Sequence, residues 1–518
     1  MKKLLCMIAA ILFLALVSSA MIGCSQTADT TSPEKAAERT SEKEDKEDKE
    51  PSDKEDKESS DKGDKEPSDK EDKEPSEKED EQLTGKSYAE LLFDPSVVHT
   101  VDVTISDADW TDLKANPLGK TKYIASVFID GESLENVSFS TKGDTSLKQV
   151  VKDTESDRYS FKINFGKIIK GQTYHGLNKL HLNSCYADAT YMKDYISYEI
   201  FRRTGVAAPL ISYVWLSVNG EPRGLYTAIE DVSEAFLDRT ADGKGMLYKP
   251  EKSKYTNIYG EEVESDQGAS LLYIDDNISS YPNIFDNAET KADDEDKLRV
   301  VSALKALSEG TDMSGVLYAD EVIRYFAAHN FLMNFDSYNS SMLHNYYLYE
   351  GDGKLAMVPW DYNMAFGCFS DLPGLAKYII DPTPLINMGI DSPLVEVQAE
   401  ERPMWRWIAE DDSARQLYHT AVDSLLSDHI ESGECEELIT ALQEKLLPYV
   451  EKDPTAFYSV EEFNTGVQAM KQFLKLRAAS VRAQLAGTLS ADTGSQNPED
   501  WVDASGLNLF LMGGQDMQ

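Results

Sequence analysis

The chain has 518 residues and carries 92 acidic against 51 basic side chains, which gives a formal net charge of −41. This balance argues against nucleic acid as a partner, because binding to phosphate groups requires a basic surface. Beyond the N-terminal segment only Cys185, Cys368 and Cys435 remain. Three cysteines allow one disulfide and exclude a disulfide framework.

The first residues have the charge and apolar pattern of a secretory signal peptide. Two lysines precede an apolar run from Leu4 to Ile22, and the small residue Gly23 comes before Cys24. The ending Met-Ile-Gly-Cys resembles a lipobox, which implies that residues 1–23 are removed and that Cys24 is diacylated. We therefore expect an extracytoplasmic protein, lipid-anchored to the bacterial cell membrane, because two acyl chains suffice for stable anchoring. The alternative is an uncleaved helix, since about nineteen apolar residues could span a bilayer.

Residues 24–82 form a polar segment built on a short repeat. The unit PSDKEDKE starts at Pro51 and again at Pro67, with altered copies at Ser59 and Pro75. Such a sequence has too little apolar surface to offset the entropy of folding, so we expect a disordered acidic stalk. An acidic interaction tail is the alternative.

Residues 87–235 are expected to form a strand-rich lobe. Alternating apolar residues predict strands over residues 101–105, 123–129, 159–163, 213–218 and 223–229. Turn sequences at Asp130-Gly131 and Asn219-Gly220 predict hairpins. Helical spacing predicts one helix from about Ala189 to Arg203, closed by Gly205.

Residues 236–489 are expected to form a mostly helical second lobe, because 400 globular residues exceed the size of one ordinary core. Helical spacing covers residues 299–307, 320–333, 413–426, 435–450 and 459–485. The last of these begins with a capping box, Ser459 and Glu462. Short strands are expected at residues 346–349 and 355–358. The tail, residues 490–518, could either dock on this lobe or hang free.

Several segments resemble, in their order and spacing, the CotH spore-coat kinase-like family. They are Lys142-Gly143, Tyr159–Lys162, Tyr213–Glu230, Arg324–Asp336, Asn345–Tyr349, Val358–Asp361 and Phe366-Gly367. The resemblance implies an α+β fold, namely a bilobal atypical protein-kinase-like domain with a strand-rich N-lobe and a helical C-lobe.

The resemblance also implies roles for single residues, since phosphoryl transfer needs cations at the nucleotide, carboxylates for Mg²⁺ or Mn²⁺ and a carboxylate beside the attacking hydroxyl. Lys142 and Lys162 would contact the phosphates of ATP, and Glu230 would lie at the adenine. Asp336 would be the catalytic-loop aspartate, whose carboxylate orients and deprotonates the acceptor hydroxyl. Asn345 and Asp361 would hold the metal. Each residue also has an ordinary structural interpretation, as a surface lysine, a cap or a turn residue.

Some assignments stay open at the level of sequence. The helix acid that would pair with Lys162 is either Asp194 or Glu199, and Asn339 could replace Asn345. Two positions depart from the family pattern. Ser140 stands where the family usually has an arginine, and Asn363 stands where it commonly has a second aspartate.

The expected function is therefore that of an extracytoplasmic kinase that transfers the γ-phosphoryl group of ATP to Ser, Thr or Tyr hydroxyls of surface or secreted proteins. No phosphate-binding Walker loop, nucleophile elbow or His-Glu-x-x-His motif is present. Two alternatives remain, a pseudokinase scaffold that binds nucleotide or metal without transfer, and a non-enzymatic adhesion or envelope-assembly module.

Overall fold

The computed structural model describes residues 85–514, apart from residues 154, 257–260, 370, 371, 373, 374 and 376–380. The expected signal peptide, Cys24 and the stalk through residue 82 lie outside the described residues. Within the described ranges, no helix has both the length and the apolar character needed to cross a membrane.

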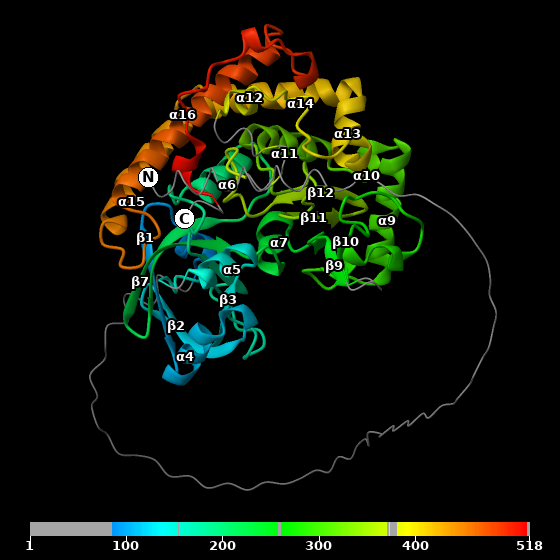
Figure 1. The fold of residues 1–518 in the computed structure, drawn as a ribbon. Coiled ribbons are helices and arrows are strands. Elements are labelled where there is room, and N and C mark those ends of the chain that lie inside the picture. Colours follow the sequence, from blue (N-terminus) through cyan, green and yellow to red (C-terminus); the bar gives the residue numbers. More distant parts are fainter. Residues whose placement is uncertain are drawn as a thin grey trace, which may run out of the picture. The chain divides into compact units, whose positions relative to one another are not determined.

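Seven strands of the first half close into a barrel, drawn in blue to green in Figure 1. The order around the barrel is β1-β2-β3-β4-β5-β7-β6, and β1 closes it by pairing in parallel with β6. The strands are β1 Val98–Ile105, β2 Tyr123–Ile129, β3 Glu132–Lys142, β4 Ser160–Asn164, β5 Lys179–Asn183, β6 Ile211–Val218 and β7 Glu221–Glu230. The other neighbouring strands are antiparallel.

Period-two alternation explains why these segments form a barrel. Along β2, for example, Tyr123, Ala125, Val127 and Ile129 are buried, as expected for a strand with one face in the core. The predicted hairpin turns are confirmed, because Asp130-Gly131 and Asn219-Gly220 both have positive φ at both residues. All five predicted strands are present, whereas β3 and β5 were not predicted.

Three helices lie between or beside the barrel strands, and five further strands follow in two small sheets. The helices are α4 Asp107–Ala115, α5 Thr145–Lys152 and α6 Lys193–Arg203. The strands are β8 Met246–Tyr248, β9 Ser253–Thr256, β10 Glu262–Ser265, β11 Tyr346–Gly351 and β12 Lys354–Pro359. β11 pairs with both β8 and β12, and β9 pairs with β10. The predicted strands at 346–349 and 355–358 are thus confirmed.

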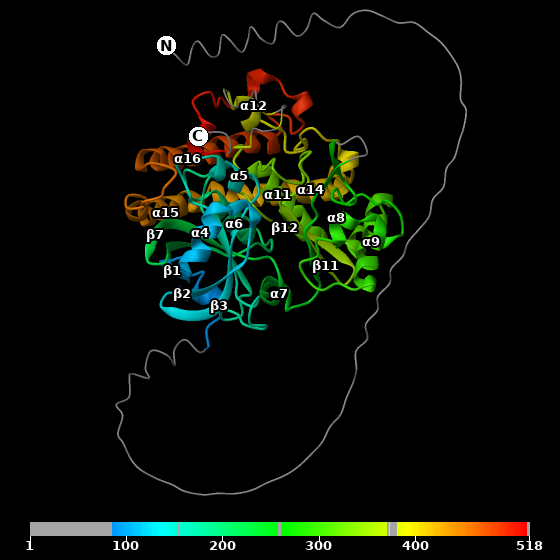
Figure 2. The same ribbon diagram turned by 60° about the horizontal axis from the view of Figure 1, so that its bottom comes forward.

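The second half is mainly helical, as predicted, and both ribbon views show its long helices together (Figures 1 and 2). The α-helices of at least eight residues there are α7 Glu234–Ala241, α9 Asp294–Glu309, α11 Ala319–Leu332, α13 Pro403–Glu410, α14 Asp412–Leu425, α15 Glu434–Val450 and α16 Val460–Leu485. Shorter helices are α3 Tyr88–Leu91, α8 Pro282–Phe285, α10 Met313–Val316 and α12 Thr383–Ile386. The capping box of Ser459 and Glu462 begins α16, as the sequence predicts.

Helix α6 begins four residues later than predicted, for a local electrostatic reason. The carboxylate of Asp188 accepts hydrogen bonds from the backbone N–H of Thr190 at 2.9 Å and of Lys193 at 2.8 Å. Tyr191 between them has a φ of 57°. Residues 188–192 therefore form a non-helical turn, and the helix begins only after it. The helix then runs to Arg203, and Gly205 follows with a φ of 79°.

The C-terminal tail docks on the helices, which the sequence left open. Leu507, Leu509 and Met512 are buried, and the short helix η8 Leu509–Met512 packs against α16. Figure 1 shows this red segment lying along α16. The three cysteines Cys185, Cys368 and Cys435 are free thiols, so the disulfide that the sequence allows is absent from the described residues.

A buried ion pair connects the barrel to the segment between α15 and α16. Arg158 donates to both carboxylate oxygens of Asp453, at 2.9 and 3.0 Å, and neither side chain is exposed to solvent. Asp453 also accepts from the backbone N–H of Leu225 on β7 at 2.8 Å. The carboxylate fits because β7 has Gly224 here, where a Cβ atom would lie 1.9 Å from the Asp453 carboxylate.

We expect Asp453→Asn to lower the free energy of unfolding by about 3–5 kcal/mol, because the substitution leaves a buried guanidinium without its counter-charge. Urea unfolding, followed by circular dichroism, measures the change. The matched control is Asp423→Asn, which removes the half-exposed partner of Arg482 and should cost less than about 1 kcal/mol. Equal effects of the two substitutions would contradict a special role for the buried pair.

Candidate active site

Polar side chains from the barrel and from the second half gather at one place in the molecule. The barrel contributes residues at the ends of β3, β4, β5 and β7, and the second half contributes the loops after α11 and β12. The electrostatic interactions of Lys142 with Asp361 and Asp194 connect the two sides. All of these elements are fixed by strand pairing or helix packing, which limits how far the side chains can move.

Asp336 lies in the loop after α11 and is held by two neighbours. One carboxylate oxygen pairs with Nε2 of His344, and the other accepts a hydrogen bond from Nδ2 of Asn345 at 3.0 Å. The same Nδ2 donates to the backbone carbonyl of Asp336 at 2.8 Å. Burial lowers the pKa of His344, but the charge of Asp336 and its hydrogen bond outweigh that effect and raise the pKa overall.

Nδ2 of Asn345 makes both of these bonds, and among the described residues no hydrogen bond reaches its Oδ1 oxygen. Asn345 has a φ of 58°, a left-handed conformation that asparagine and aspartate adopt more readily than other side chains. The structure thus brings together Asp336 and Asn345, two residues to which the family resemblance gives site roles, and those roles stay predictions.

Asp361 follows β12 and has its backbone fixed from helix α6. Its N–H donates to the hydroxyl of Tyr198 at 3.0 Å, and the next N–H, of Tyr362, donates to the carboxylate of Asp194 at 2.7 Å. Asp361 has a φ of 53°, which is backbone strain of the kind found at functional sites. Its half-buried carboxylate accepts no hydrogen bond and forms no ion pair within the described residues.

Two carboxylates therefore lie near one another with little compensation. Burial, and then the charge of Asp361, raise the pKa of Asp194 to about 8. Burial also raises the pKa of Asp361, against the opposing effect of Lys142. Such a pair favours a bound cation, because a cation would stabilise both charged forms.

Lys142 is the last residue of β3, and its ammonium group lies on the barrel side of the acids. It donates to Oδ1 of Asn183 and lies 5.9 Å from the centre of the Trp360 ring. Burial lowers the pKa of Lys142 to about 8, although the charges of Asp361 and Asp194 act in the opposite direction. A lysine in this position adds positive charge where an anionic ligand would need it.

Lys162 lies on β4, opposite Ser140 of β3 and His181 of β5. Its ammonium group pairs with Asp231 at 2.7 Å, and Lys179 pairs with the same carboxylate at 3.1 Å. The hydrogen bond from His181 and the two lysine charges hold the pKa of Asp231 well below its usual range, despite burial. Burial lowers the pKa of His181 to about 3, so the ring is neutral at neutral pH.

The expected partner of Lys162 on the helix is therefore wrong. Asp194 accepts from the Tyr362 backbone, and Glu199 pairs with Arg202 and Arg203 on the outer side of α6. Asp231 takes this role instead, from the position just after β7.

The side chain of Glu230 has a structural role, because its hydrogen bonds go to neighbouring protein groups. Its fully buried carboxylate accepts from Tyr88 at 2.5 Å, from Arg239 at 2.6 and 3.0 Å and from the backbone of Leu210 at 2.9 Å. With both oxygens occupied, the side chain is not free to contact a cofactor. The expectation that Glu230 contributes its side chain to a nucleotide site is not supported by this geometry.

The donor set suits a hard divalent cation. The carboxylate of Asp361 and Oδ1 of Asn345 are oxygen ligands that accept no hydrogen bond from the described residues, and Mg²⁺ and Mn²⁺ prefer oxygen ligands. Within the described ranges, no three His, Cys, Asp or Glu side chains form a ready-made metal cluster. Mg²⁺ is commonly held by one or two carboxylates together with phosphates and water.

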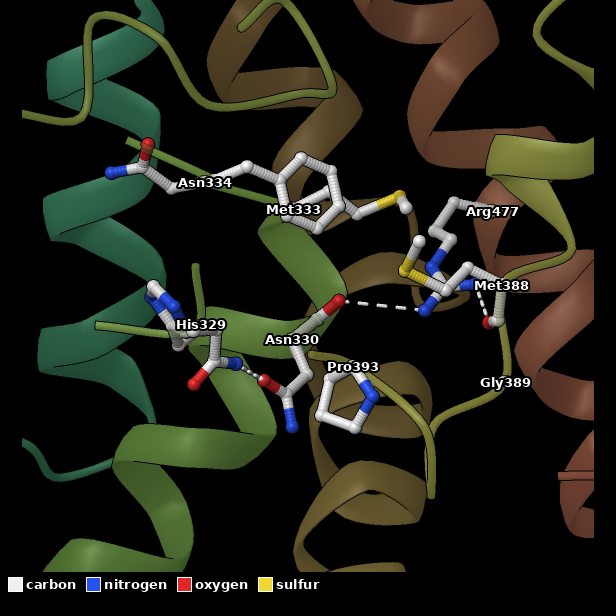
Figure 3. A pocket seen from close by; sticks show the side chains of 10 residues that line it. His329, Asn330, Met333, Asn334, Met388, Gly389, Pro393 and Arg477 are labelled. Atoms are coloured by element: carbon white, nitrogen blue, oxygen red, sulfur yellow. Dashed lines mark hydrogen bonds between the residues drawn. The ribbon is translucent and has the colours of Figure 1, made fainter. Parts of the chain in front are cut away.

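Asn339, the alternative to Asn345, lies elsewhere. It donates to Oδ1 of Asn330 at 2.6 Å and lines a small cavity with His329 and Arg477 (Figure 3). Figure 3 shows Arg477 reaching from α16 to the main-chain oxygen of Asn330 near the end of α11. It also donates to the carbonyls of Ile386 and Met388, so this buried guanidinium caps helix ends.

Comparison with known protein families covers the part of the chain that contains these residues. A sequence model of the family described as "CotH kinase protein" matches residues 139–481. The chain belongs to the CotH family. All of the site residues named above, from Lys142 to Asp361, fall within the matched segment.

Two proteins of Bacillus subtilis (strain 168) are similar to this CotH protein. Inner spore coat protein H is 22% identical over 321 residues, which cover 61% of this chain and 80% of the relative. Inner spore coat protein H-like protein is 32% identical over 76 residues, which cover 15% of this chain and 23% of the relative.

Sequence reasoning missed several polar residues of the CotH site. The pairing of β4 with β5 and of β5 with β7 brings three of them to the site, namely Asp231, His181 and Asn183. A loop brings the fourth, His344. The position of His344, eight residues after Asp336, was the one available signal, since a histidine so near an aspartate is a candidate hydrogen-bond partner.

A separate prediction concerns His329, whose Nδ1 lies 2.6 Å from the hydroxyl of Tyr362. Burial lowers its pKa from 6.5 to about 3. The unfolded chain therefore binds a proton first, and the free energy of unfolding falls as the pH drops from about 6.5 toward 3. For this residue the loss at pH 5 relative to pH 7.5 should be about 2 kcal/mol.

His329→Asn keeps a polar atom near the Nδ1 position and removes the titrating group. The loss of unfolding free energy that His329 causes between pH 7.5 and pH 5 should therefore disappear. Urea unfolding at several pH values tests this. His419→Asn, at a partly exposed histidine beside Asp391, is the control and should keep the His329 component. An unchanged pH dependence in His329→Asn would show that His329 is not the group responsible.

Proposed function

We propose that this CotH protein is a kinase that transfers the γ-phosphoryl group of ATP to hydroxyl groups of proteins, with Mg²⁺ or Mn²⁺ bound at Asp361 and Asn345. One observation carries the proposal. The carboxylate of Asp361 and Oδ1 of Asn345 lack protein partners within the described residues, yet they lie in a site that also holds Lys142 and Asp336. An adhesion module has no use for strained, uncompensated acids beside a buried lysine.

The cationic side of the site fits the phosphates of a nucleotide. Lys142 comes from the end of β3, and Lys162 and Lys179 share Asp231. The shared carboxylate keeps these two ammonium groups in place, which lowers the entropy lost when they bind an anion. A divalent metal, when bound, would neutralise phosphate charge and orient the transferred group.

In this proposal Asp336 is the residue that acts on the acceptor hydroxyl. In the proposed reaction its carboxylate orients the hydroxyl and accepts the proton as the O–P bond forms and the bond to the leaving phosphate breaks. Asn345 holds this carboxylate in position through Nδ2 while offering Oδ1 to the metal. Burial opposes protonation of His344, but Asp336 raises the pKa of this side chain overall and so favours its protonated form, and His344 would have to exchange its hydrogen bond for one to the acceptor.

A pseudokinase is the second candidate, and two residues favour it. Ser140 and Asn363 replace an arginine and an aspartate that the family resemblance leads one to expect. Asn363 supplies a neutral oxygen, so metal binding would be weaker than with two carboxylates. The location that we propose, a lipid anchor at Cys24 outside the cytoplasm, would direct either activity to surface or secreted proteins.

The proposed function is tested by phosphoryl transfer from γ-labelled ATP with Mn²⁺ or Mg²⁺, using a chain that begins at Gln82 and extracts of surface proteins as acceptors. Asp336→Asn should lower transfer by about 10²–10⁴-fold, the usual contribution of a general base. Asp361→Asn should abolish it, because the metal loses its charged ligand. Asparagine tolerates the left-handed backbone at residue 361, so the fold should be retained.

Asp352→Asn is the matched control. Asp352 also follows a strand and has a φ of 52°, but it lies exposed in the turn between β11 and β12. This variant should transfer as well as the native chain. Thermal stabilisation by ATP that depends on Asp361 but brings no transfer would indicate the pseudokinase. Neither transfer nor stabilisation by a folded chain would refute nucleotide binding.

A further inference from the structure

The C-terminal tail contacts the two elements that hold the site acids. It lies beyond residues 139–481, the segment matched by the family model. The backbone oxygen of Met512 accepts from the N–H of Ala189 at 3.1 Å, and that of Gly513 accepts from Nζ of Lys193 at 2.7 Å. On the other side, Sγ of Cys368 donates to the carbonyl of Leu509 at 3.8 Å.

These contacts lead directly to the site. Lys193 is the first residue of α6 and precedes Asp194, which binds the Tyr362 backbone next to Asp361. Cys368 lies in the segment that continues from Asp361, and the N–H groups of Phe366 and Gly367 bind carbonyls at the end of α11. The tail therefore contacts the start of α6 and the segment after Asp361 together.

Lys193 connects the start of α6 to the tail. Its side chain is fully buried, and its ammonium group donates to the carbonyls of Ala187 and Gly513. A buried ammonium group that loses a hydrogen bond must regain it from water or from a rearranged backbone. Removal of the tail would thus disturb the turn from Asp188 to Lys193.

Two glycines show how closely the tail is seated. A Cβ atom at Gly466, inside α16, would lie 2.6 Å from the carbonyl oxygen of Leu511. A Cβ atom at Gly513, which has a φ of 84°, would lie 2.8 Å from the nitrogen of Ala189. Glycine inside a helix is a poor helix former, so Gly466 is explained by the approach of the tail rather than by α16 itself.

We propose that residues 507–513 form a strap, and that the strap and Lys193 are positioning elements that hold Asp194 and Asp361 in the geometry for metal binding. The inference about the metal rests on the proposed function. The inference about the position of the two acids does not, because it follows from the hydrogen bonds among Gly513, Lys193, Asp194 and Tyr362.

The test uses Gly466→Ala in the full chain. Alanine favours the helix but collides with the Leu511 carbonyl, so the strap should detach while α16 persists. Hydrogen exchange, read by mass spectrometry, should become at least tenfold faster at the amides of Ala189, Asp361 and Tyr362. The concentration of Mn²⁺ for half-maximal transfer should rise about tenfold, with little change in the rate at saturating Mn²⁺.

Gly506→Ala is the control, because a Cβ atom there has 3.9 Å to its nearest neighbour, Nε2 of Gln472, and the residue lies in the same tail. It should match the native chain in both measurements. Lys193→Met provides a second route, since it keeps the length of the side chain and removes its two hydrogen bonds. It should accelerate exchange at the same amides.

The outcomes separate the two proposals. Unchanged exchange at residues 189, 361 and 362 in both Gly466→Ala and Lys193→Met would overturn the strap. Faster exchange with an unaltered Mn²⁺ requirement would also overturn it as a positioning element for the metal. If the native chain shows no transfer, the kinase proposal fails, and Mn²⁺ binding measured by electron paramagnetic resonance then tests the strap alone.

Discussion

The buried ion pair between Arg158 and Asp453 is the constraint on which the arrangement of the whole molecule depends. The guanidinium group also donates to the carbonyls of Ser184, Arg223 and Leu225, so it ties the ends of several barrel strands to one loop of the helical half. A buried charge cannot change partners without a large cost in free energy. The barrel is therefore fixed against α15 and α16, and the boundary between the two halves acquires a defined geometry. Site residues come from both sides of that boundary, which makes their relative positions a consequence of this pair.

The site at this boundary has two parts, which differ in how far their charges are compensated. Around Asp231, the carboxylate pairs with two lysines, of which Lys179 also pairs with Glu289 at 3.6 Å, and it accepts a hydrogen bond from the neutral ring of His181, so the charges of this part are balanced. Around Asp361 and Asp194, carboxylates gather without comparable compensation, and the pKa values of both are raised. The first part is preorganised to receive an anion and the second to receive a cation. A metal–nucleotide complex has both charges, with the separation between them fixed by its own covalent structure.

The sequence predicted those features that depend on local pattern. Alternation identified five barrel strands, and Asn-Gly and Asp-Gly identified the tight turns, because these signals act over a few residues. The resemblance named Asp336 and Asn345, which are hydrogen-bonded to each other in the loop after α11, and Asp361, which lies in the loop after β12. Long-range pairing was not predictable in this way. Asp231 reaches Lys162 only because β5 lies between β4 and β7, and Glu230 is withdrawn from the site only because Tyr88 and Arg239 arrive from other elements.

Ser140 illustrates how a departure from a family pattern can be physically consistent with the site. It lies directly opposite Lys162 in the pairing of β3 with β4, and it precedes Lys142 by two residues on the same strand. Residues so related share one face of the sheet. An arginine here would add a third cation beside two lysines, of which Lys162 already has its acid in Asp231 and Lys142 has an amide partner in Asn183. Serine removes the repulsion and keeps a hydroxyl for hydrogen bonding, and under the proposed function it would leave phosphate recognition to the lysines. Binding should then depend more strongly on Lys142 than the family pattern alone would indicate.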